Sequence, residues 1–167
     1  MFHSLAEFYP TYEQFTAGTL KLFGALTDKS LDCCVTEGHR STGQAAWHIV
    51  TSIPEMMSHT GLGLSSVDYQ APRPKKAAEI VSAYRRVSDE LLSQIKKNWT
   101  DETLKVADDM YGSQWPRGLT LRILLDHEIH HRGQLTVLMR NAGLVVPGIF
   151  GPAKEEWAKF GGQPPEN

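Results

Sequence analysis

The sequence predicts an all-α protein, an antiparallel four-helix bundle with long loops and an irregular C-terminal tail. Four segments repeat apolar residues at helical spacing, and no run of alternating apolar and polar residues indicates a strand. Histidines lie among the apolar residues that face inward, as in bundles that build metal sites in their cores. The chain has 167 residues, of which 41% are hydrophobic and 22% are charged, so we expect one domain over residues 1–167.

The first half of the chain contains two of the helical patterns. The first spans residues 4–26, and Pro10 is tolerable there if it falls in the first turn. A polar segment follows, and the second pattern spans residues 43–60. Pro54 predicts a kink or a division of this second helix. His48 lies on its inward stripe, well before the proline.

The second half begins with a loop over residues 61–74, which contains two glycines and two prolines. The clearest periodicity of the chain follows at Ile80, Tyr84, Val87, Leu91 and Ile95. Residues 110–116 look irregular, and the fourth helix is expected from about Leu119 to a stop at residues 141–143. Its inward stripe consists of Leu121, Leu124, His127, His131, Leu135 and Leu138. The tail from Leu144 has little periodicity, apart from one or two possible turns over residues 153–160.

Charge and composition exclude several classes of function. Seventeen basic and nineteen acidic side chains give a net charge of -2, which provides no general attraction to nucleic acid or to an anionic membrane. No basic leader with an apolar segment is present, and no stretch has the roughly 20 apolar residues of a membrane-spanning helix. The two cysteines, Cys33 and Cys34, are adjacent and indicate no disulfide framework. We therefore expect a cytoplasmic protein that binds neither nucleic acid nor membrane.

His127 and His131 provide the strongest indication of function. Four residues advance about 400° on an α-helix, so these two side chains lie about 40° apart on one face. Two imidazoles at this spacing can bind one metal ion. A single inward histidine such as His48 is more often a hydrogen-bonded core residue than a ligand. Burying three imidazoles without partners is costly, however, whereas a shared cation satisfies them together. We therefore predict a metal site at these two histidines.

Three neighbours of this pair are candidates to support a ligand or to contact a substrate. His130 lies about 60° from His127 around the helix, where it flanks the site or is solvated. Gln134 follows His131 by about one turn, and its alternative role is to satisfy polar groups inside the bundle. Glu128 occupies the position at which an HExxH zinc peptidase keeps its general base. No histidine follows His131 to complete such a peptidase site, so three-histidine ligation is the preferred interpretation.

Three sequence elements resemble a known family. They are Trp47-His48-Ile49, the run from His127 to Gln134 (HEIHHRGQ), and the ending from Gly143 to Pro152 (GLVVPGIFGP). With these elements the chain resembles the DinB/YfiT-like family of small metal-binding four-helix bundles over essentially its whole length. By matching position, the resemblance implies that His48, His127 and His131 are the metal ligands. It also implies a homodimer.

Three neutral imidazoles do not compensate the double positive charge of an ion such as zinc or nickel. A fourth coordination position remains for water or substrate. Such an ion lowers the pKa of bound water or binds a thiol as thiolate, so hydrolysis and thiol chemistry are both accessible. The resemblance favours a thiol-dependent S-transferase, with a low-molecular-weight thiol as cosubstrate and a small-molecule substrate. The alternative is a non-catalytic, metal-stabilised stress-response or binding module. No individual catalytic residue is predicted.

Overall fold

The computed structural model describes residues 1–165, and most of them are helical. Its four α-helices are α1 (Leu5–Phe23), α2 (Thr42–Ser58), α3 (Ala77–Asn98) and α4 (Arg117–Asn141). Three short 3₁₀ helices, η1 (Asp28–Asp32), η2 (Glu102–Lys105) and η3 (Lys154–Phe160), and two strands, β1 (Ala107–Met110) and β2 (Ser113–Pro116), complete the described part of the chain. The mostly helical prediction is confirmed, but the fold is not strictly all-α.

The two strands form an antiparallel hairpin where the sequence indicated irregular structure. Met110 pairs with Ser113, so only Tyr111 and Gly112 connect the strands. Both have positive φ, 59° and 85°, as a type I′ turn requires. The strands are four residues long, and their sequences, ADDM and SQWP, do not alternate apolar and polar side chains, so the sequence indicated no strand there.

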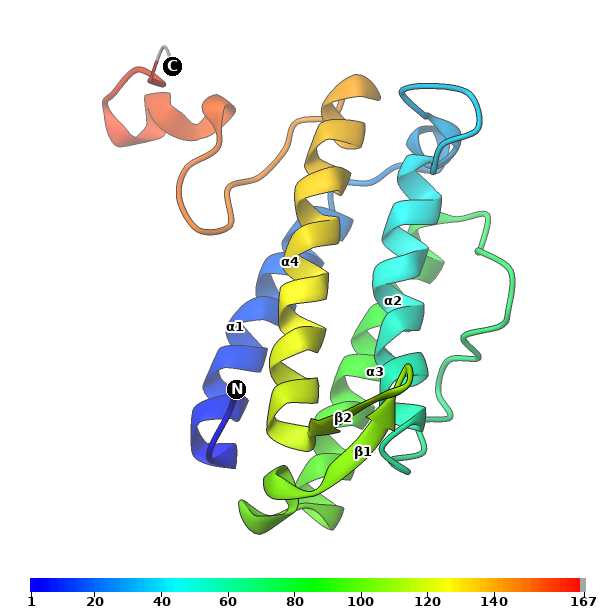
Figure 1. The fold of residues 1–167 in the computed structure, drawn as a ribbon. Coiled ribbons are helices and arrows are strands. Elements are labelled where there is room, and N and C mark those ends of the chain that lie inside the picture. The colour runs from blue at the N-terminus through cyan, green and yellow to red at the C-terminus, as the bar shows by residue number, and fades with distance from the viewer. Residues whose placement is uncertain (166–167) are drawn as a thin grey trace.

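The helices do not simply alternate in direction (Figure 1). The α3 start lies beside η1, where the Ala77 amide donates to Asp28 Oδ1 over 2.8 Å. The α3 end lies near the start of α1, where Asp101 Oδ1 accepts from the Leu5 amide at 2.7 Å. Since residues 59–76 run back along the molecule between them, α2 and α3 point the same way. The predicted antiparallel arrangement is therefore corrected: α1 and α4 run in one direction and α2 and α3 in the other.

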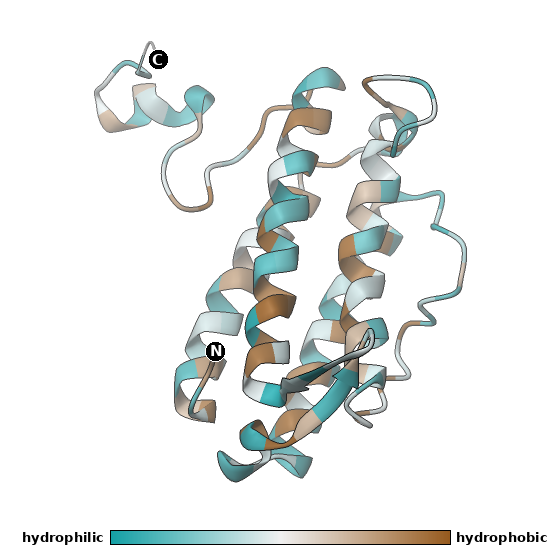
Figure 2. Ribbon diagram, in the orientation of Figure 1, coloured by the Kyte–Doolittle hydropathy of each residue, from teal (hydrophilic) through white to brown (hydrophobic). Residues whose placement is uncertain are grey.

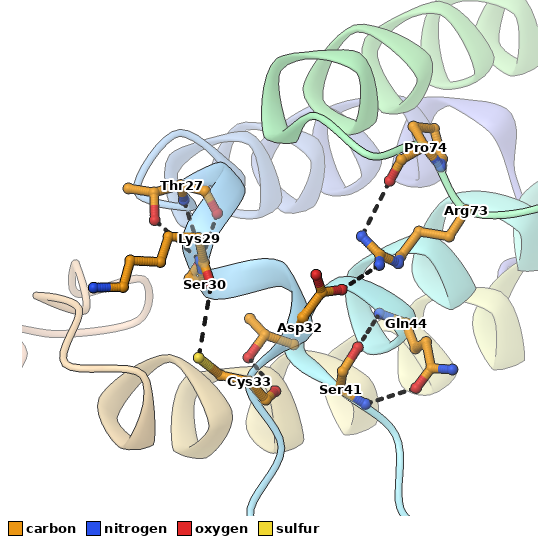
Figure 3. Close-up of polar contacts among 10 residues, drawn as sticks. Thr27, Lys29, Ser30, Asp32, Cys33, Ser41, Gln44, Arg73 and Pro74 are labelled. Carbon is orange, nitrogen blue, oxygen red and sulfur yellow. Dashed lines mark hydrogen bonds and ion pairs between the residues drawn. The ribbon is translucent and has the colours of Figure 1, made fainter.

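Polar contacts cap the start of α2 and join η1 to the segment before α3 (Figure 3). Ser41 caps α2 by accepting from the Gln44 amide, and the Gln44 side chain accepts from the Ser41 amide in return. Arg73, just before α3, forms an ion pair with Asp32 and also donates to the Pro74 carbonyl. The capping box satisfies two amides that would otherwise lack partners at a helix start. These contacts fix the beginning of the helix that contains His48.

All four α-helices contribute to one apolar core, and α2 and α4 share the most extensive contact. Brown and teal residues alternate along these helices in Figure 2, as expected when one side of each helix faces the core. Burying one large apolar side chain stabilises the fold by about 1.5–3 kcal/mol. The largest fully buried side chains include Phe8, Tyr12, Leu22, Phe23, Ile49, Ile53, Tyr84 and Leu91.

Two details of the helices differ from expectation. α2 continues without division through Pro54. Pro10 is the sixth residue of α1 rather than part of its first turn. In the tail, ion pairs join η3 to α1 through Lys21 and Glu156 and to α4 through Arg140 and Glu155. Phe150 contacts Phe15 of α1 with ring centroids 5.6 Å apart. No helix among residues 1–165 is both long and apolar enough to cross a membrane.

Candidate metal centre

The structure brings together the three histidines that the sequence singled out. His48 comes from the second turn of α2, and His127 and His131 come from the middle of α4. One ring nitrogen from each lies within 4.8 Å of the other two. The ring centroid of His48 is 5.1 Å from that of His127 and 4.4 Å from that of His131. Because α2 and α4 pack against each other over their length, helix packing alone produces this cluster.

The spacing of the ring nitrogens is suitable for a divalent ion. His127 Nε2 and His131 Nε2 are 3.1 Å apart. Two nitrogens that each bind zinc at about 2.0–2.1 Å across a tetrahedral angle are about 3.3 Å from each other. The same 3.1 Å also allows a hydrogen bond between the two imidazoles. The donor set is three imidazoles, so these histidines could hold a metal ion.

Burial favours the neutral form of the three imidazoles by lowering their pKa values. Burial is the main cause that lowers the pKa of His48 to about 4, with smaller contributions from the positive charges of Arg40 and the two other histidines. Burial, followed by the proximity of His131, also lowers the pKa of His127 to about 4. The pKa of His131 is lowered mainly by burial, against the opposing effect of its hydrogen bond to Gln134. Neutral imidazole is the form that binds metals.

Gln134 and His130 extend the cluster toward solvent. Gln134 Oε1 lies 2.9 Å from His131 Nδ1, which leaves Nε2 of the same ring for a metal. The amide nitrogen of Gln134 lies 2.9 Å from His130 Nε2. Both residues are exposed. A hydrogen bond to the second ring nitrogen fixes the tautomer and the orientation of a metal-binding histidine, so Gln134 is placed to orient His131.

Glu128 belongs to a different part of the core. It is 2% exposed, and its Oε1 accepts hydrogen bonds from the hydroxyls of Thr19 at 2.5 Å and Tyr84 at 2.9 Å. Burial raises the pKa of its carboxyl group against the opposing effects of Thr19, Arg132 and Tyr84. Glu128 is absent from the group of close metal-binding atoms. The suggestion that it supports the metal site or acts as the base of an HExxH peptidase is therefore corrected, because its carboxylate points into the interface of α1 and α3 with α4.

A cavity of about 420 Å³ adjoins the histidine cluster. Two of the three histidines, His48 and His127, form part of its wall. The remaining lining comes from α2, the hairpin and α4, and consists of Ser52, Glu55, Met56, Tyr111, Trp115 and Ile123. The cluster is thus accessible to a small molecule rather than sealed within the core.

Two parts of the site were not predicted from the sequence: Glu55 as a lining residue, and the hairpin as a wall of the cavity. Tyr111 and Trp115 line the cavity, whereas Phe150 lies against Arg132 on another side of α4. Glu55 follows His48 by seven residues, which places both on one face of a helix. That spacing was visible in the sequence. The spatial proximity of the hairpin to α2 was not.

Comparison with known proteins gives the family. The DinB family model matches residues 1–166. The chain belongs to the DinB family. It is 43% identical over 166 residues to the Bacillus subtilis (strain 168) protein YrdA, described as uncharacterized, with 99% of each chain covered.

Solved structures of the family agree with this fold. A DinB-like protein from Bacillus cereus ATCC 10987 matches with a TM-score of 0.86 and 38% identity, over 90% of this chain and 100% of that one. The DinB-like protein YjoA from Bacillus subtilis matches with a TM-score of 0.68 and 19% identity, over 86% of this chain and 96% of that one. The second match supports the fold alone.

Proposed function

We propose that this DinB-family protein is a metal-dependent enzyme, a thiol-dependent S-transferase or a related hydrolase. In this proposal His48, His127 and His131 hold one divalent ion, zinc or nickel. The main supporting observation is that the three-imidazole cluster borders a cavity large enough for a small substrate. A purely structural metal site would not need such access.

The chemistry follows from the donor set. When bound by three neutral imidazoles, a divalent ion acts as a Lewis acid and lowers the pKa of a thiol or water in its open coordination position. His48 and His127, which would hold the ion, form part of the cavity wall, and Gln134 would orient His131 as the third ligand. Met56 and Ile123 make part of the lining apolar, which strengthens electrostatic interactions at the site by excluding water.

Other properties are proposed from the family and the sequence. We expect a low-molecular-weight thiol as cosubstrate, a cytoplasmic protein, and the compact four-helix bundle and homodimer that the resemblance implies. A molecular mass measured by size-exclusion chromatography with light scattering tests the dimer, and a monomer at micromolar concentration would reject it.

Metal content per chain tests the proposed ligands. We expect about one zinc or nickel ion per chain after gentle purification, and close to none in His48→Ala, His127→Ala and His131→Ala. His39→Ala is the matched control, because His39 is exposed in the segment before α2, and it should retain the ion. Retention by all three ligand variants would refute the assignment.

A second candidate, a non-catalytic metal-stabilised module, is favoured by one observation. The cluster joins α2 and α4, the two helices with the largest mutual contact, so an ion there would act mainly as a cross-link. Absorption spectra of the cobalt-substituted protein separate the two candidates. Perturbation of the spectrum by added thiols, followed by thiol transfer to an electrophile, supports the enzyme, whereas a spectrum that no thiol in a panel changes supports the module.

A further inference from the structure

The cavity beside the histidine cluster has a second polar end. α2 contributes His48, Ser52, Glu55 and Met56, residues that share one helix face at spacings of four, seven and eight. His48 lies at one end of this row. Glu55 lies seven residues further along, which is about 10 Å of helix axis. Among the residues that line the cavity, Glu55 is the acidic one.

Two neighbours hold the Glu55 carboxylate in place. The Tyr111 hydroxyl donates to Glu55 Oε2 over 2.8 Å, and His59 Nε2 lies 3.3 Å from Glu55 Oε1. A carboxylate can accept about four hydrogen bonds, so two acceptor positions remain. The side chain is 36% exposed. Glu55 is therefore oriented in advance and still able to accept from a ligand.

The hairpin adds aromatic rings to the same end of the cavity. The ring centroids of Tyr111 and Trp115 are 6.1 Å apart, with the ring planes inclined by 69°. The Tyr111 ring also lies 4.9 Å from His59. The electron-rich faces of tyrosine and tryptophan attract cations, most strongly where water is partly excluded. Tyr111 contacts Glu55 directly and Trp115 lines the same cavity, so this end of the cavity is a suitable environment for an organic ammonium group.

We propose that this end of the cavity binds the primary ammonium group of a small substrate, through Glu55, Tyr111 and Trp115. The inference rests on the proposed function in one respect: the thiol end of the same molecule would lie near His48 and His127. The separation of about 10 Å along α2 favours an extended aminothiol over one with two carbons between its ends. The substrate class is thus a thiol that bears a distant amine.

The competing explanation is that Glu55 only anchors the hairpin to α2. Two substitutions separate these roles. Glu55→Gln keeps an oxygen that can accept from Tyr111 but removes the charge that attracts the ammonium group. Tyr111→Phe removes the hydroxyl anchor but keeps the aromatic ring and the Glu55 charge. Only the ammonium proposal predicts that these variants behave differently toward amines.

The first experiment uses probes without a thiol, so that it depends on no metal. Binding of pentylammonium, 1-pentanol and pentanoate to the full chain is followed through the indole N–H resonance of Trp115, assigned with Trp115→Phe. We expect saturable binding of pentylammonium at least tenfold tighter than that of 1-pentanol, and the weakest binding for pentanoate. Equal affinities for the amine and the alcohol in the unmodified protein would overturn the proposal without reference to any variant.

The variants sharpen this test. Glu55→Gln should lower the affinity for pentylammonium at least tenfold, to the level of 1-pentanol, while Tyr111→Phe should keep the preference for the amine. Glu79→Gln is the matched control, because Glu79 is exposed on α3, and it should change neither affinity. Loss of the preference in both Glu55→Gln and Tyr111→Phe would favour the anchor role and overturn the proposal.

A second arm connects the ammonium site to the metal. In the cobalt-loaded protein, 5-aminopentane-1-thiol should perturb the absorption spectrum at concentrations at least tenfold lower than 1-pentanethiol. Equal concentrations for the two thiols would overturn the present inference and leave the proposed function standing. Failure of both thiols to perturb the spectrum, with amine selectivity retained in the first experiment, would instead count against the proposed function.

Discussion

The two faces of α4 place polar groups in the core in opposite ways. His127 and His131 face α2, where their ring nitrogens lie near one another and near those of His48 beside a cavity. Glu128, between them in sequence, faces α1 and α3, where two hydroxyls bind its carboxylate. One face leaves ring nitrogens available to an external ligand, and the other binds Glu128 Oε1 within the protein, while Oε2 has no partner among the described residues. A five-residue motif can therefore contain both part of a candidate metal site and a structural contact.

We expect substitutions on the histidine face to change metal binding and substitutions on the Glu128 face to change stability. Glu128→Ala should have the largest effect on stability. It leaves the Thr19 and Tyr84 hydroxyls without their acceptor and opens a void, so we expect a loss of about 3 kcal/mol. Glu128→Gln keeps an acceptor oxygen and should cost about 1 kcal/mol. Urea denaturation measures both values. Loss of bound metal from folded Glu128→Gln would show that the two faces of α4 do not act independently.

Removal of the metal should have the next largest effect. An ion that binds only the folded state stabilises it by about 2.7 kcal/mol when its free concentration is 100 times Kd. For a chain of this size, each kcal/mol of stabilisation raises Tm by about 2–4 °C. Thermal denaturation with and without a chelator measures the difference, which should vanish in His48→Ala. An equal chelator effect in that variant would show that the stabilising ion binds elsewhere.

Gln134→Ala tests the support of the histidine face. Because Gln134 contacts the second ring nitrogen of His131, we expect metal affinity to fall about 10- to 100-fold while folding stability of the metal-free protein stays the same. Competition with a chromophoric chelator measures the affinity. Gln94→Ala, on α3, serves as control. An affinity for Gln134→Ala equal to that of the control would mean that Gln134 does not orient the ligand.

The smallest expected effect concerns a single hydroxyl on the Glu128 face. Tyr84→Phe keeps the ring that packs against Phe23 with centroids 5.2 Å apart but removes one hydrogen bond to Glu128, at a cost of about 1 kcal/mol. The hydroxyl of Tyr12, also fully buried, has no partner among the described residues, so Tyr12→Phe should be nearly neutral. Equal losses in the two variants would show that the hydrogen bond from Tyr84 to Glu128 adds nothing measurable to stability.

Helical periodicity was sufficient to predict α3 and α4, because their apolar residues recur at steps of three and four, and it placed three histidines on faces that meet. Their meeting follows from the packing of α2 against α4. The parallel course of α2 and α3 could not be predicted, since it depends on the path of residues 59–76, which have no periodic pattern. The position of Glu128 is also a result of tertiary structure: its partners Thr19 and Tyr84 are 109 and 44 residues away.

The hairpin shows the limit of local patterns in another way. Its turn residues, Tyr111 and Gly112, adopt positive φ, and tyrosine is an unusual residue for the first of these positions. The contact between Tyr111 and Glu55 joins residues 56 positions apart. It supports one wall of the cavity, so the shape of the candidate binding site depends on a contact that sequence spacing alone does not reveal.

X-ray absorption at the metal edge of the purified, metal-loaded protein identifies the atoms that bind the ion. We expect one ion per chain with three imidazole nitrogens at about 2.0–2.1 Å, and loss of that signal in His131→Ala. A coordination shell made of carboxylate oxygens or cysteine sulfur, or an unchanged spectrum in His131→Ala, would contradict this expectation.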